Sequence, residues 1–233
     1  MKPPGPATWH WLAHCPDNFD TMNTTPAQLL ASGLQQLPLV AILRGLTPAE
    51  APAIGQALTG AGFVLLEVPL NSPLPLDSIA ALAAQHPDLL IGAGTVMRAA
   101  DVRNVHAAGG RLIISPHFDA DVVHEALRLE LACMPGVATP SEAFAALKAG
   151  AHALKLFPAE MIGPAVVKAL RAVLPASVPL LPVGGVSADN MAAWRQAGAS
   201  GFGIGSALYK PGQSVAQTTA AANTFIQSWK SIP

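Results

Sequence analysis

Short apolar runs alternate with alanine-rich stretches eight times along this chain, and this alternation restricts its fold more than any other feature. The apolar runs have the length and composition of buried β-strands, and the alanine-rich stretches have helical spacing. Alternating strands and helices are expected to form βα units around a parallel sheet. The predicted strands span residues 39–44, 64–70, 89–96, 112–116, 132–137, 153–157, 180–184 and 201–205.

Capping residues mark the ends of the predicted helices. Thr139-Pro140-Ser141-Glu142 is typical of a helix start, and Ala149-Gly150 is typical of a helix end. Eight strand–helix units predict an α/β fold of the (β/α)8 TIM-barrel type. The alternative is an open doubly wound sheet, which normally carries a GxGxxG motif after its first strand. Residues 44–47 read Arg-Gly-Leu-Thr instead, so the barrel is favoured.

The chain of 233 residues has the size of a single domain. We assign residues 37–233 to the barrel. Residues 1–36 contain three prolines near their start and lack the strand–helix repeat, so we interpret them as an N-terminal extension that is partly helical or disordered.

Composition argues against several classes of partner. The net charge is −1 and no basic run occurs, so nucleic acid is not an expected partner. No uninterrupted apolar run of about 20 residues predicts a membrane span. Cys15 and Cys133 match no zinc or redox spacing, and the amino terminus lacks the apolar segment of a secretory signal, so we expect a cytoplasmic protein.

Three charged residues interrupt the otherwise apolar strands: Arg44, Glu67 and Lys155. Each lies toward the carboxyl end of its strand, where a barrel builds its active site. Strand periodicity places Glu67 with Leu65, and Lys155 with Ala153, on the face that lines the barrel interior. Burial of a charge costs free energy unless the charge is paired or functional, so these residues are the leading site candidates.

Lys155 lies among apolar neighbours, which favour the neutral, nucleophilic amine. Glu67 has the position of a general acid or base. Two alternatives stay open at this point: Lys155 and Glu67 could form a structural ion pair, and Arg44 could either bind a substrate carboxylate or orient Glu67.

Small residues complete the predicted mouth. Residues 92–94 read Gly-Ala-Gly and leave room for a ligand beside Thr95, although these glycines could equally serve tight packing. Gly184-Gly185 and Gly205-Ser206 follow the last two strands, where barrels commonly bind phosphate through backbone N–H groups.

Together these motifs resemble the class I 2-keto-3-deoxy-6-phosphosugar-acid aldolases from about residue 37 to the carboxyl end. The motifs that carry the resemblance are Ala-Ile-Leu-Arg-Gly (41–45), Glu-Val-Pro-Leu-Asn-Ser-Pro (67–73), Gly-Ala-Gly-Thr-Val (92–96), Ser-Pro (115–116), Ala-Leu-Lys-Leu-Phe-Pro-Ala-Glu (153–160) and Val-Gly-Gly-Val (183–186). Within the family, Asn71 and Val183 resemble the branch that acts on the galactonate derivative. The gluconate branch, or dual specificity, is the alternative. The N-terminal extension departs from the family pattern.

The resemblance implies a carbon–carbon lyase that releases pyruvate and glyceraldehyde 3-phosphate from a small phosphorylated keto-deoxy sugar acid. It implies no cofactor, no metal and a homotrimer. By resemblance, Lys155 is the Schiff-base lysine and Glu67 transfers protons. Arg44, Thr95 and Pro116 would hold the carboxylate end of the substrate, and the pairs Gly184-Gly185 and Gly205-Ser206 would hold its phosphate.

Two other functions are compatible with such a barrel. A lyase that uses a metal-bound enolate would need two or three carboxylate or histidine ligands at the mouth, where Glu67 is the single candidate. A non-catalytic phosphosugar-binding protein would share the phosphate glycines but would not require a lysine inside an apolar strand.

Overall fold

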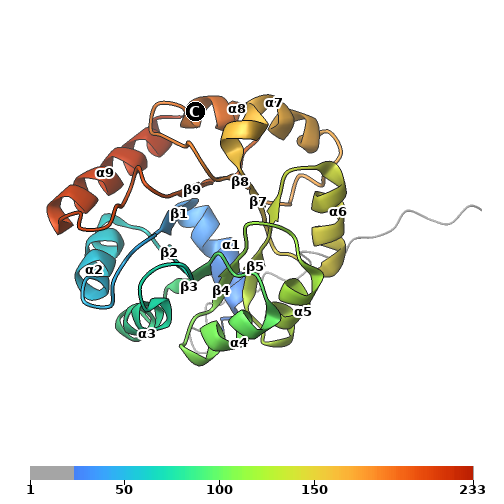
Figure 1. Ribbon diagram of the computed structural model, residues 1–233. Coiled ribbons are helices and arrows are strands. Elements are labelled where there is room, and N and C mark those ends of the chain that lie inside the picture. The colour runs from blue at the N-terminus through green and yellow to red at the C-terminus, as the bar shows by residue number, and fades with distance from the viewer. Residues whose placement is uncertain (1–23, 233) are drawn as a thin grey trace, which may run out of the picture.

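A computed structural model describes residues 24–232, and these residues form a closed barrel of parallel strands surrounded by helices (Figure 1). The fold class is therefore the predicted one. The strands are β1 (Leu39–Ile42), β2 (Leu65–Pro69), β3 (Leu90–Gly94), β4 (Leu112–Ile114), β5 (Ala132–Met134), β6 (Gly136–Val137), β7 (Leu154–Leu156), β8 (Leu180–Pro182) and β9 (Phe202–Ile204).

Two hydrogen-bonded sheets make up the wall of the barrel. The order β5-β4-β3-β2-β1-β9 forms one sheet and β6-β7-β8 forms the other, and all pairings are parallel. A bridge between Val183 and Gly203 joins β8 to β9. The chain itself joins β5 to β6, so the ring is complete.

The prediction that residues 132–137 form one strand was wrong. The structure divides this segment into β5 and β6 at Pro135, a residue that has no N–H to donate to a neighbouring strand. The other predicted strands are also longer than the observed ones. Arg44, Pro116, Gly184 and Gly205 lie in the loops that follow the strands, not within them.

Nine helices are described in residues 24–232: α1 (Pro26–Gln36), α2 (Ala51–Ala61), α3 (Pro75–Gln85), α4 (Ala99–Ala107), α5 (Ala120–Arg128), α6 (Pro140–Ala149), α7 (Ala159–Arg171), α8 (Met191–Gln196) and α9 (Val215–Ser231). The predicted start of α6 is confirmed, because Thr139 and Glu142 form a capping box. Gly150 ends this helix in the left-handed conformation, with φ of 102°. None of the helices in this range is long and apolar enough to cross a bilayer.

Strand residues alternate between two apolar clusters. Leu66 and Leu154 point outward into the layer shared with the helices. Leu65 and Ala153 point inward and form part of a smaller cluster inside the barrel. This alternation is the expected one, so Glu67 and Lys155, two residues further along the same strands, also face the interior.

Helix α1 closes one end of the barrel. In Figure 1 it lies across the middle of the ring of strands. Leu30 is 2% exposed and packs in the inner cluster with Leu65, Leu90 and Leu112, which are the first residues of β2, β3 and β4. Helix α1 therefore covers the amino-terminal ends of the strands and leaves the carboxyl ends as the mouth.

Helix α1 belongs to the segment 1–36 that the sequence assigned to the extension. The boundary between residues 36 and 37 stays a prediction, and residues 1–23 of the extension lie outside the described residues.

Candidate active site

Glu67 and Lys155 are both buried inside the barrel. Glu67 lies on β2 with 1% of its surface exposed, and Lys155 lies on β7 with 5% exposed. Glu67 pairs in register with Ile42 of β1 and Gly92 of β3. The strands therefore carry two ionisable groups into the interior, where charge is costly.

Burial raises the pKa of Glu67 to about 7, even though the charges of Lys155 and Arg44 and the backbone of Gly94 lower it. The Glu67 Oε2 atom has no hydrogen-bond partner among residues 24–232. A side chain at Gly94 would overlap the Glu67 carboxylate, so this glycine makes room for Glu67 and not for a ligand. A carboxyl with a pKa near neutrality can both accept and return a proton under physiological conditions.

Lys155 lies in an environment that favours its neutral amine. Burial lowers the pKa of Lys155, as does the charge of Arg44, while the charge of Glu67 raises it. Its Nζ lies 4.8 Å from the centroid of the Phe157 ring. Of the ion pairs within 4.0 Å among residues 24–232, none joins Lys155 to Glu67. The structure thus offers no direct ion pair that would explain the buried lysine.

Arg44 lies at the exposed rim of the mouth, directly after β1. Its Nη1 donates a hydrogen bond of 2.6 Å to Oδ1 of Asn71, the first residue of the β2–α3 connection to be exposed. Among residues 24–232, Arg44 forms no ion pair with Glu67. Since a guanidinium has five N–H donors, Arg44 retains donors for a carboxylate ligand.

Thr95 and Pro116 also lie where their strands end at the mouth. Thr95 follows β3 with φ of 58°, a left-handed conformation that is strained for a β-branched residue. The Pro116 carbonyl lies against Gly136, where a side chain would overlap it, and Gly136 pairs in register with Lys155. Pro116 is thereby brought to the strand beside the buried lysine.

The two predicted phosphate loops lie on adjacent strands, joined at the Val183–Gly203 bridge. Gly184 and Gly185 have φ values of 109° and 64°. Ser206 lies in an exposed turn after β9, and a Cβ at Gly205 would meet no atom within 4 Å. The backbone N–H of Ser206 has no acceptor among residues 24–232, so it is available to an anion.

Glu160, the last residue of the 153–160 motif and not among the predicted site residues, also contacts the glycine pair. A Cβ on Gly184 would lie 3.0 Å from Glu160 Oε2, and one on Gly185 would lie 3.2 Å from Glu160 Oε1. The absence of side chains at these glycines is therefore explained partly by Glu160. An anion bound there would repel this exposed carboxylate.

Val183 directly follows β8 and precedes the glycine pair. Its side chain is 6% exposed and packs against Gly203, beside the side chain of Ile42. Val183 has the same strand parity as Leu181, which belongs to the inner cluster, so it faces the interior of the barrel.

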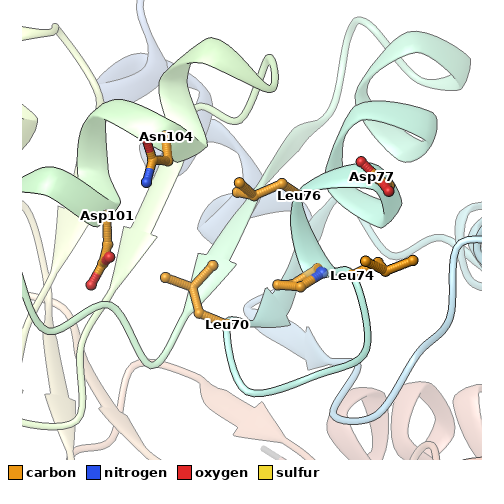
Figure 2. Close-up of a pocket in the computed structure, with 7 residues that line it drawn as sticks. Leu70, Leu74, Leu76, Asp77, Asp101 and Asn104 are labelled. Atoms are coloured by element: carbon orange, nitrogen blue, oxygen red, sulfur yellow. The ribbon is translucent and has the colours of Figure 1, made fainter.

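A separate hollow of about 320 Å³ lies between the start of α3 and helix α4 (Figure 2). Leu70, Leu74 and Leu76 form its apolar side, and Asp101 and Asn104 lie opposite. None of the predicted site residues lines it. Among the residues described, no group of three or more His, Cys, Asp or Glu side chains is arranged to hold a metal ion.

Comparison with known proteins shows the family of this chain. The family model described as "Aldolase: KDPG and KHG aldolase" matches residues 30–222, which is most of the chain. The chain belongs to this aldolase family. The matched region contains every predicted site residue and most of helix α1.

Individual members of the family are also similar to this chain. The 2-dehydro-3-deoxy-6-phosphogalactonate aldolase of Escherichia coli is 45% identical over 84% of this chain and 96% of its own length. A solved structure described as native KDPGal is 45% identical, with a TM-score of 0.82 over 84% of this chain and 95% of its own.

A more distant family member provides chemical information. The KDPG aldolase of Legionella pneumophila, whose structure holds pyruvate captured as a covalent carbinolamine intermediate, is 27% identical to this chain. Its TM-score is 0.72, over 90% of this chain and 98% of its own.

Proposed function

We propose that this chain is a class I aldolase that cleaves 2-dehydro-3-deoxy-6-phosphogalactonate into pyruvate and glyceraldehyde 3-phosphate. The observation that carries the proposal is the pair of buried groups, Lys155 and Glu67, which face the barrel interior without a direct ion pair. A lysine with a lowered pKa is suited to attack a carbonyl, and a carboxyl with a pKa of about 7 is suited to move protons.

The reaction begins when the neutral amine of Lys155 attacks the C2 carbonyl of the substrate. Glu67 in its protonated form donates a proton to the hydroxyl of the resulting carbinolamine, and loss of water then gives an iminium ion and leaves Glu67 as a carboxylate. Glu67, directly or through water, removes the proton of the C4 hydroxyl, the C3–C4 bond breaks, and its electron pair moves toward the iminium nitrogen. Glyceraldehyde 3-phosphate leaves, C3 of the enamine takes up a proton, and hydrolysis of the imine releases pyruvate and regenerates Lys155.

Groups on opposite sides of the mouth would hold the two ends of the substrate. Arg44 would bind the carboxylate through the donors that Asn71 does not use, with Thr95 and the Pro116 backbone beside it. The phosphate would bind to the backbone of Gly184-Gly185 and Gly205-Ser206, after Glu160 turns away.

The galactonate derivative is proposed as the substrate for two reasons. The relative that is 45% identical, from Escherichia coli, has that activity in its name. In addition, Val183 faces the interior and offers no hydrogen bond to a C4 hydroxyl, whereas a threonine could bind one. Asn71 is the second proposed specificity residue.

Pyruvate and borohydride provide the direct test, because borohydride reduces an imine to a stable secondary amine. Mass spectrometry should find one reduced pyruvyl group on Lys155 and none on Lys148 or Lys168, which are exposed on helices. Lys155→Ala should lose the adduct and the cleavage activity, and Lys148→Ala should retain both. An adduct elsewhere with Lys155 unmodified would refute the assignment.

The alternatives are an aldolase for the gluconate derivative or for both epimers, and a phosphosugar-binding barrel without activity. A binding protein of this kind would bind the phosphosugar acids and release no pyruvate from either epimer.

We also propose a homotrimer, as the family resemblance implies. The exposed apolar side chains of Leu74 and Met97, 66% and 51% exposed, are compatible with a contact between subunits, and light scattering would give the mass.

A further inference from the structure

The β1–α2 and β2–α3 connections are joined side by side at the mouth by two hydrogen bonds. Arg44 Nη1 donates to Asn71 Oδ1 at 2.6 Å, and the Gly45 backbone N–H donates to Ser72 Oγ at 2.9 Å. Ser72 is 8% exposed. Gly45 has φ of 81°, and its α-carbon packs so closely on Pro211 that a Cβ would lie 2.5 Å from the proline Cγ. The backbone that carries Arg44 is thus fixed from two sides.

The side chain of Arg44 is restrained by its hydrogen bond to Asn71. Arg44 is exposed, and a free arginine at a rim samples many rotamers. An amide oxygen is a neutral acceptor, so it restricts the guanidinium without neutralising its charge. An aspartate at position 71 would give a similar geometry but would pair with Arg44 and compete with an anionic ligand.

The charge of Arg44 acts on the two buried ionisable groups, Glu67 and Lys155. The groups that act on Glu67 are Lys155 on β7, Arg44 after β1 and the Gly94 backbone on β3. The charge of Arg44 lowers the pKa of both Glu67 and Lys155. Asn71 follows Glu67 by four residues, so one connection carries both the carboxyl group and the residue that holds Arg44.

We propose that Asn71 is a positioning residue that holds the Arg44 guanidinium at one place on the rim, where its charge acts on the substrate carboxylate and on Glu67 and Lys155. This inference rests on the proposed function, because it assigns Arg44 to the carboxylate end of the substrate. Asn71 itself need not touch the substrate, and in this proposal it acts through Arg44.

The test compares Asn71→Ala with the matched control Asn104→Ala, since Asn104 is an exposed asparagine on α4 away from Arg44. Loss of a hydrogen bond to a charged group should raise KM for the phosphosugar acid about tenfold in Asn71→Ala. Without Asn71, the Arg44 guanidinium is no longer held near Glu67 and lowers the pKa of this carboxyl less, so the acid limb of kcat/KM should move to higher pH. Asn104→Ala should show neither change.

Asn71→Asp is the second variant and preserves the shape of the side chain. It should raise KM at least as much as Asn71→Ala, because its carboxylate pairs with Arg44 and repels the carboxylate of the substrate. A KM and a pH profile equal to wild type in both variants would overturn the proposal. Equal shifts in Asn104→Ala would also overturn it, because they would indicate a general effect of surface substitution.

Borohydride trapping separates this inference from the proposed function. At saturating pyruvate, Asn71→Ala should still form the adduct on Lys155, since the lysine remains in place. An adduct with unchanged KM and pH profile would refute the role of Asn71 alone. Absence of any lysine adduct in the wild-type protein would refute the proposed function, and this inference with it.

Discussion

The two ends of the barrel differ in composition although they are built from the same strands. At the closed end, Leu65 of β2 and Ala153 before β7 pack with Leu30 of helix α1 in an apolar cluster. Two residues further along, the same strands carry Glu67 and Lys155. The buried side chains at the closed end are thus apolar, whereas the mouth contains two buried side chains that are ionisable.

This difference indicates that stability and chemistry are concentrated at opposite ends. Apolar burial at the closed end favours the folded state. Burial of Glu67 opposes the folded state whenever its carboxyl is charged, because Oε2 has no hydrogen-bond partner in the part of the chain that the structure describes. Substitutions at the two ends should therefore change different properties, and the following predictions test that separation.

Glu67→Gln should have the largest effect, at the mouth. The amide retains the size of the side chain but cannot move a proton, so the cleavage rate should fall by roughly 10²–10⁴ while pyruvate still forms the imine slowly. Steady-state kinetics together with borohydride trapping measure both steps. Cleavage at close to the wild-type rate would exclude Glu67 as the acid or base.

The same variant should be more stable relative to wild type at pH 8 than at pH 5. The pKa of Glu67 is raised from 4.5 to about 7 in the folded state. Between these two pH values the Glu67 carboxyl ionises in the unfolded state but stays protonated in the folded state, so the wild-type protein loses stability as the pH rises. Glutamine removes this loss. Urea unfolding at both pH values tests it, and a stability difference that is independent of pH would contradict the raised pKa.

Leu30→Ala should have the next largest effect, at the closed end. Removal of a leucine side chain that is 2% exposed should lower the free energy of unfolding by about 2–5 kcal/mol. The kcat of the folded fraction should stay near wild type, because Leu30 lies at the opposite end from Lys155. The matched control is Val173→Ala, since Val173 is an apolar residue that is 56% exposed.

Urea unfolding and kcat at a temperature where both variants are folded measure these effects. A large loss of kcat in Leu30→Ala without a loss of stability would show that the two ends are not separate.

Val183→Thr should have the smallest effect and should change substrate preference. A hydroxyl that gains a partner in one epimer changes discrimination by about 1–3 kcal/mol, or roughly tenfold to a hundredfold. The ratio of kcat/KM values should move toward the gluconate derivative, and wild type should cleave the galactonate derivative at least as well.

Val186→Thr is the matched control, because Val186 is equally buried but belongs to the outer cluster. It should not change the ratio of kcat/KM for the two epimers. A ratio unchanged by Val183→Thr, or a strong wild-type preference for gluconate, would contradict the assigned role of position 183.

Much of the fold could be predicted from local sequence. Side-chain alternation and helix caps depend on residues within a few positions of one another, so the barrel fold and the inward orientation of Glu67 and Lys155 followed from the sequence. The division of the fifth strand at Pro135 was missed although proline gives a local signal. The loops after the strands were assigned to strands because their apolar and glycine residues continue the strand pattern.

The contacts of the candidate site could be predicted less completely. Gly94 was correctly placed at the mouth, but only the structure shows that its missing side chain leaves space for the Glu67 carboxylate. Likewise, the sequence shows the glycine pair at 184–185 and the motif that contains Glu160, but not their contact.

The amino-acid sequence alone was enough to predict that this chain forms βα units, that two of its strands carry inward-facing charges, and where the mouth lies. The tertiary structure decided that Arg44 is held by Asn71, 27 residues away, and that helix α1 covers the opposite end of the barrel. The difference depends on how far apart the interacting residues are in the sequence. Periodicity and the cost of a charge in an apolar strand are local properties, whereas these contacts exist only once barrel closure has brought distant loops together.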